Sequence, residues 1–135
     1  MSYAMAGGLQ AGLFDLLTTD VGMQGLVGGA VFDAVPKPAP DLFVALGPEI
    51  AEGRSDASGA GAVHEVALSV VTTRAGYADA KAVAARISEV IEGGGMTLPR
   101  GRVAAARFVK ARARVDEGEG VRRIDMRFRL RVQDD

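Results

Sequence analysis

The sequence predicts an α+β domain, in which an antiparallel β-sheet of about four strands carries two main α-helices on one face. Two observations indicate this class. Apolar and charged residues alternate strictly over residues 121–132, as on a strand with one buried face. Residues 4–17 and 80–92 instead repeat apolar residues every three to four positions, which is the period of an amphipathic helix. At 135 residues the chain suits one core, so we expect a single domain over 1–135.

The first helix is expected over residues 4–17, where five apolar side chains share one stripe: Met5, Leu9, Leu13, Leu16 and Leu17. The Thr-Thr-Asp sequence at 18–20 ends this helix. Any of these three residues can cap a short second helical turn over residues 24–27. The glycine pair at 28–29 then ends that turn, because glycine tolerates left-handed backbone angles.

The next segment contains two expected strands separated by a rigid connector. Residues 30–34 read as a short strand. Three prolines at alternate positions between residues 36 and 40 remove backbone donors and fix an extended course, which excludes a helix or a central strand there. A strand pattern resumes over residues 42–50, with a bulge or an edge feature expected at Gly47 and Pro48.

Residues 52–62 are predicted to be a flexible loop, because they contain no large apolar side chain that could hold them against a core. Two interpretations stay open: an ordinary mobile hairpin loop, or a loop that orders on docking to a neighbour. The second makes four polar residues candidates for docking: Arg54, Ser55, Asp56 and Ser58. A second long strand follows over residues 63–73, and the helix at 80–92 ends at the glycines of 93–95.

Residues 102–115 alternate again and should form a C-terminal hairpin, about 102–132, with residues 121–132. On this pattern Phe108 shares the basic face of the strand. If the apolar faces of the two strands lie on the same side of the hairpin, the numbers of any two directly opposed residues add up to an odd sum. This places either Lys110 or Arg112 opposite Asp125. We interpret Asp125 as moderating the surrounding positive charge, through a pair that contributes about 0.2–1 kcal/mol.

Charge is segregated along the chain although the net charge is only −1. Residues 1–99 hold five basic and eleven acidic side chains, whereas residues 100–135 hold eleven basic and six acidic ones. Oppositely charged regions can steer association between subunits, or they can be ordinary solvated charge on one hairpin.

The sequence indicates no enzyme, and we expect no catalytic, cofactor-binding or metal-binding residues. Cysteine is absent, and His64 is the single histidine, on the apolar side of its strand, where a structural role is expected. The motifs of serine hydrolases, phosphate-binding loops and zinc helices are missing. Residues 1–14 lack the basic start of a signal peptide and the length of a membrane span, so we expect no membrane partner and cytoplasmic assembly.

A small nucleic-acid-binding module is the alternative function. Eleven basic residues between positions 100 and 131 could neutralise phosphates. However, Phe108 is the only aromatic residue expected on the same face as these basic residues. Proteins that bind single strands stack several bases on aromatic rings, so the aromatic part of this pattern is missing. A protein interface, which favours arginine for its planar multi-donor head, fits the pattern better.

Nearly the whole chain resembles the small tail terminator, or tail completion, proteins of long-tailed phages, and most of all the tail terminator of bacterial gene transfer agents. The resemblance lies in the apolar core of the first helix at 9–17, in LVGGAVFDAVP at 26–36, in DLFVALG at 41–47, in HEVALSVVTTRAGYADAKAVAARI at 64–87 and in the closing basic hairpin. These motifs are apolar patterns punctuated by glycine and proline.

The resemblance implies a structural virion protein without enzyme activity or cofactor. Such proteins form a hexameric ring on the head-proximal end of the tail tube, which ends tube polymerisation and joins the tail to the head-side stopper or connector protein. DNA would pass through the lumen without sequence-specific binding. We therefore expect the protein to become part of a phage-like particle. Seven basic residues are the candidates for subunit or tail-tube contacts: Lys110, Arg112, Arg114, Arg123, Arg127, Arg129 and Arg131.

Overall fold

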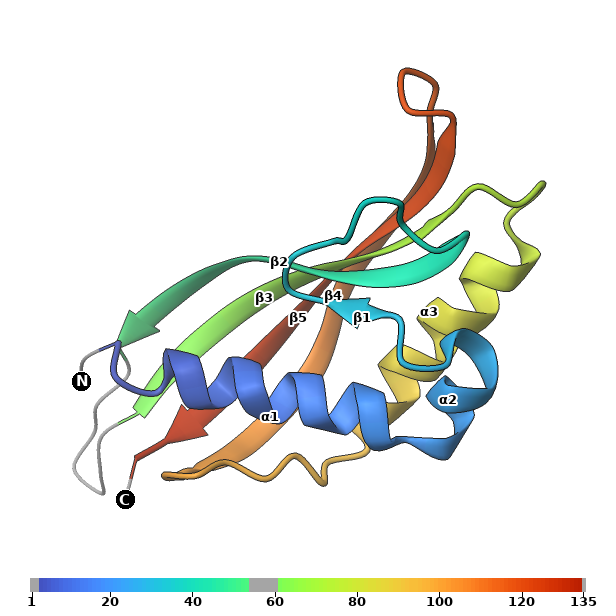
Figure 1. Cartoon of the computed structure of the whole chain (residues 1–135). Helices are drawn as coiled ribbons and strands as arrows, with labels where there is room; N and C mark the ends of the chain where they lie inside the picture. Colours follow the sequence, from blue (N-terminus) through green and yellow to red (C-terminus); the bar gives the residue numbers. More distant parts are fainter. Residues whose placement is uncertain (1–2, 54–60, 135) are drawn as a thin grey trace.

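A computed structural model describes residues 3–53 and 61–134 as three helices and one sheet (Figure 1). The elements follow in the order α1 (Ala6–Thr19), α2 (Val21–Val27), β1 (Val31–Phe32), β2 (Leu42–Gly53), β3 (Gly61–Thr72), α3 (Ala78–Glu92), β4 (Arg102–Asp116) and β5 (Val121–Gln133). The sheet order is β1-β2-β3-β5-β4. The α+β class and the C-terminal hairpin are as the sequence predicts.

The sheet differs from the prediction in strand number and in one strand direction. It has five strands, and β1 pairs with β2 in parallel, with Val31 opposite Val44. The proline-containing connector returns the chain to the end of the sheet at which β1 begins, so β1 and β2 run in the same direction. A strand of two residues is too short for a sequence pattern to reveal its direction or its pairing.

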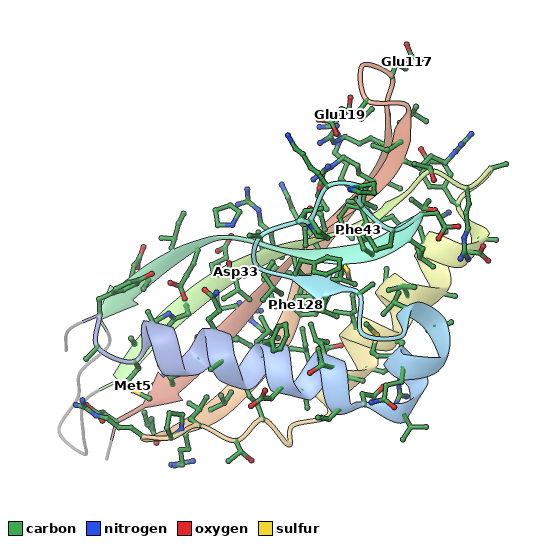
Figure 2. The ribbon with its side chains drawn as sticks, in the orientation of Figure 1. Met5, Asp33, Phe43, Glu117, Glu119 and Phe128 are labelled. Atoms are coloured by element: carbon green, nitrogen blue, oxygen red, sulfur yellow. The ribbon has the colours of Figure 1, made fainter. Side chains whose placement is uncertain are left out.

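The two main helices, α1 and α3, share one core with the inner face of the sheet. Their predicted stripes supply Leu9 and Leu17 from α1 and Ile87 from α3, each at most 1% exposed. Phe128 and Leu130 of β5 are fully buried against them. The apolar side of β5, where Figure 2 labels Phe128, is therefore the side that joins the sheet to the helices, and the arginine side faces away from them.

The short helix α2 begins at Val21, earlier than the predicted turn at 24–27, because Asp20 acts as its N-cap. The Asp20 carboxylate accepts a hydrogen bond from the Met23 backbone N–H at 2.9 Å. The Arg86 guanidinium of α3 donates to the same carboxylate at 2.8 and 2.7 Å. These hydrogen bonds hold the pKa of Asp20 at about 2 although burial opposes the shift, and they tie α2 to α3.

A β-bulge in β2 confirms the irregularity expected at Gly47 and Pro48. The register with β3 shifts between Leu46 and Glu49, which places Glu49 on the inner face and leaves Ile50 on the outer face, 61% exposed. A Cβ on Gly47 would lie 3.0 Å from the Ala67 carbonyl oxygen, so the bulge brings the two backbones close together. The bulge therefore decides which side chains of the second half of β2 reach the core.

Two further bulges in β4 correct the predicted faces of that strand. Near the turn, Arg112 lies opposite Asp125, which is one of the two registers the alternation allows. The register then shifts between Phe108 and Lys110, so Phe108 pairs with Phe128 on the inner face. The expectation that Phe108 shares the basic face is wrong, because one extra residue in a strand reverses the side of everything beyond it.

The loop predicted at 52–62 is shorter than expected, because both flanking strands extend into it. Glu52 and Gly53 belong to β2, and Gly61 and Ala62 belong to β3; Ala62 is 2% exposed. Backbone pairing between the strands overrides the polar composition of these ends. The four docking candidates, Arg54, Ser55, Asp56 and Ser58, lie outside the described residues.

Candidate functional site

The outer face of the sheet gathers the basic side chains that the sequence singles out. The odd-numbered residues of β5 from 123 to 131 point away from the core. The register sets Lys110 opposite Arg127, Arg112 opposite Asp125 and Arg114 opposite Arg123. All seven predicted contact residues therefore lie on this face, across the central strand β5 and the edge strand β4.

Asp125 lies between these cations as the sequence indicates. Its carboxylate accepts hydrogen bonds from the Ser69 hydroxyl at 2.6 Å and from Arg114 Nε at 3.0 Å, and Arg123 Nε lies 3.6 Å away. Partial burial alone would raise the pKa of Asp125, but these hydrogen bonds outweigh it, so the pKa lies below its ordinary value. Asp125 is thus a fixed negative charge that orients two arginines.

Glu65 of β3 plays the same part further along the face. Arg127 and Arg129 each place a terminal guanidinium nitrogen 3.3 Å from one of its carboxylate oxygens. The hydrogen bond from Arg129, and next the one from Arg127, lowers the pKa of Glu65. The sequence analysis missed this residue, because its pairing across β3 and β5 depends on a register that no local pattern encodes.

Uncompensated positive charge remains along the outer edge of this face. Arg107 lies directly opposite Arg129, and Lys110 lies opposite Arg127, although like charges at such positions destabilise a sheet. Arg107, Lys110 and Arg112, here called the edge cations, are exposed and have no ion-pair partner within residues 3–53 and 61–134. An anionic partner would relieve this repulsion.

Arg107 is a member of this face that the sequence analysis missed. It lies on the outer face because of the bulge that turns Phe108 inward. One signal was present: Phe108 and Val109 are adjacent large apolar residues in an otherwise alternating strand, and such a break marks a possible change of phase.

Two of the hollows on the outer face are lined by both polar and apolar side chains. One of about 260 Å³ lies between β2, β3 and β5, lined by Ile50, Glu52, Val63, Glu65 and Arg129. Another of about 480 Å³ lies where the proline connector covers Phe43 and Val71 and faces Glu119 of the hairpin. Among the described residues that line these two hollows there is no histidine.

A polar cluster lies on the inner side, at the end of β2. His64 is fully buried, and its Nδ1 lies 2.7 Å from a carboxylate oxygen of Glu49, which the bulge in β2 has turned inward. The Tyr3 hydroxyl donates to the other oxygen of Glu49, which raises the pKa of Tyr3. Glu49 of β2 therefore links His64 of β3 and Tyr3 near the start of the chain, while His64 Nε2 is buried without a partner in the described structure.

Two further tests concern metals and membranes. Within residues 3–53 and 61–134, no group of three or more histidine, aspartate or glutamate side chains is arranged to hold a metal ion. In the same part of the chain, no helix has the length and hydropathy required to cross a membrane.

The family described as tail completion protein gp17 matches residues 11–133, nearly the whole chain. The chain belongs to this family. The resemblance noted from the sequence is thereby confirmed, and a structural role in a tail follows from membership of the tail completion family. Among the curated proteins, none matches the chain.

One solved structure similar to this tail completion protein is described as the virion of a native gene transfer agent (GTA) particle. Its matching chain is 48% identical, and the alignment covers 98% of this chain and 99% of that one, with a TM-score of 0.88. The likeness therefore extends over the full fold and includes the C-terminal hairpin.

Proposed function

We propose that this tail completion protein forms a ring, expected to be hexameric, on the head-proximal end of a tail tube. The ring ends tube polymerisation, joins the tail to a head-side connector, and leaves a lumen through which DNA passes. Family membership and the full-length likeness to a chain of a gene transfer agent virion support this proposal. The protein would assemble in the host cytoplasm and then become part of the particle.

The observation that carries the proposal is the outer face of the sheet. A ring needs contacts in which one surface of each subunit meets a different surface of the next. The helices cover only the inner face, and the outer face presents a fixed array of arginines oriented by Glu65 and Asp125. Arginine held in this way suits a protein interface, because less side-chain freedom is lost when it binds.

Charge reversal on this face tests the proposal. We expect Arg127→Glu, Arg129→Glu and Arg131→Glu, combined in one chain, to give particles with uncapped tails of irregular length in electron micrographs. Circular dichroism and thermal unfolding of the purified variant check that it folds. Lys81→Glu, on the solvent side of α3, is the control and should give normal tails. A folded triple variant that completes tails of normal length would refute the role of this face.

Nucleic-acid binding is the second candidate, and the unpaired edge cations are the observation in its favour. The inward position of Phe108 weakens it, because the one aromatic expected among the cations lies on the other face. If this function were correct, purified protein would bind duplex or single-stranded DNA at low salt and lose affinity steeply toward physiological salt. We expect no tight binding even at low salt, since a lumen must let DNA slide.

A further inference from the structure

The hairpin formed by β4 and β5 projects past the rest of the sheet (Figure 1). Pairing between β3 and β5 ends where Thr72 meets Arg122, whereas β4 and β5 continue to Asp116 opposite Val121. The connection at 117–120 is a tight turn in which Asp116 Oδ1 accepts a hydrogen bond from the Glu119 backbone N–H at 3.3 Å. The tip is therefore an ordered protrusion at one end of the molecule.

The tip carries negative charge at the end of a basic hairpin. Glu117 and Glu119 are exposed; Figure 2 shows Glu117 at the far end of the turn and Glu119 lower on the hairpin, where it also lines the hollow beside the proline connector. Asp116 lies 3.9 Å from Arg114, whereas neither glutamate has an ion-pair partner within the described ranges 3–53 and 61–134. We call Glu117 and Glu119 the acidic tip.

The acidic tip and the edge cations cannot meet within one molecule. Five steps along the chain, from Arg112 to Glu117, amount to about 17 Å in an extended strand, and Lys110 is further still. The two charged groups are fixed on the same rigid hairpin, so bending of side chains does not close this gap. Each molecule therefore presents an unneutralised acidic protrusion and an unneutralised basic edge, some distance apart.

We propose that the acidic tip of one copy docks on the edge cations of a second copy. This contact joins two different surfaces of identical chains, so it repeats from one copy to the next and can close into a ring. A second copy fits because the same chain carries both complementary charges and its net charge is only −1, which leaves little overall repulsion between copies. The inference rests on the proposed ring and names the surfaces that hold it together.

Paired charge reversals test the docking in cells that produce particles. The tip variant combines Glu117→Lys with Glu119→Lys, and the edge variant combines Lys110→Glu with Arg112→Glu. We expect each variant alone to fail to complete tails. Producing both together should restore completion, because a lysine tip then meets a glutamate edge and the unchanged tip meets the unchanged edge. Normal tails with the tip variant alone, or no restoration by the two together, would overturn the proposal.

The control applies the same charge change elsewhere. Asp15→Lys with Asp33→Lys alters two exposed carboxylates on and beside the helix layer. This control should complete tails normally. If it fails as the tip variant does, the effect is one of net charge and the specific docking is overturned. Thermal unfolding of each purified variant against wild type shows that a loss of completion does not come from unfolding.

Cysteine cross-linking locates the contact directly, since the natural chain has no cysteine and therefore no background. Particles carrying Glu119→Cys and Lys110→Cys in one chain should give disulfide-linked multimers on a non-reducing gel after mild oxidation. Glu119→Cys with Gln10→Cys, on the exposed side of α1, should give none.

The two proposals fail in different ways in this experiment. Particles with tails of normal length but without linked multimers would overturn the tip docking and leave the capping function standing. Linked multimers in cells whose tails lack caps and vary in length would overturn the capping function and leave the docking standing.

Discussion

Replacing Phe128 and Phe108 together should cost less stability than the two single replacements added. The two rings meet edge to face, with centroids 5.8 Å apart and planes at 72°. Phe128 is fully buried, so Phe128→Leu is expected to cost about 1–2 kcal/mol through a gap in a close-packed core. Phe108 is 41% exposed, so about three-fifths of its side-chain surface is removed from water. Phe108→Ala should therefore lower the free energy of unfolding by about 1–2 kcal/mol. Their mutual contact adds a coupling of about 0.5–1.5 kcal/mol.

Urea unfolding of the wild type, both single variants and the double variant gives this coupling as a double-mutant cycle. Val115→Ala paired with Phe128→Leu is the matched control, because Val115 is also half-exposed on β4 but lies about 23 Å along the strand from Phe108. Its coupling should stay below about 0.5 kcal/mol. If the two phenylalanines couple no more strongly than the control, Phe108 does not face inward and the bulge in β4 is misplaced.

Two more predictions concern stability. The pKa of Asp20 falls from 3.8 to about 2 on folding, so its contact with Arg86 stabilises the protein fully above about pH 5, and this contribution is lost as the pH falls through 3.8 toward 2. Asp20→Asn should therefore flatten the pH dependence of the urea midpoint in that range; an unchanged slope would contradict the assignment. Gly101→Ala should lower the melting temperature, because Gly101 has φ +69° and a Cβ would lie 2.2 Å from the Gln133 carbonyl oxygen. Gly118→Ala, which has room for a Cβ, is the control, and an equal effect of both would contradict this reasoning.

The main elements could be predicted because burial on one side leaves a period in the sequence. The stripes around Leu13 and Ile87 and the alternation through Phe128 each reflect one face turned toward a shared core. The same alternation predicted the basic face, because the residues of β5 that alternate with its buried apolar residues must point outward. Glycine and proline marked the turns and the bulge at Gly47.

Features that depend on partners far apart in the sequence could not be predicted in the same way. The bulge beside Phe108 reverses a face through one residue; the adjacent apolar residues Phe108 and Val109 mark a possible change of phase, but only the pairing with β5 fixes where the extra residue lies. The pairing of Glu65 with Arg127 and Arg129 requires the register of β3 against β5. The direction of β1 is set by the path of the connector and by contacts with β2, and two residues carry no record of either.

The edge strand β4 also affects how a second chain can associate with the sheet. Two bulges interrupt its pairing pattern, and the Phe108 backbone N–H is already occupied by the Glu92 carboxylate of α3 at 3.1 Å. At the opposite edge, β1 covers only Val44 and Ala45 of the twelve-residue strand β2. The bulged edge of β4 is a poor template for backbone pairing with another chain. Association through this edge then depends on side chains, whose charges limit both its geometry and the ionic strength at which it persists.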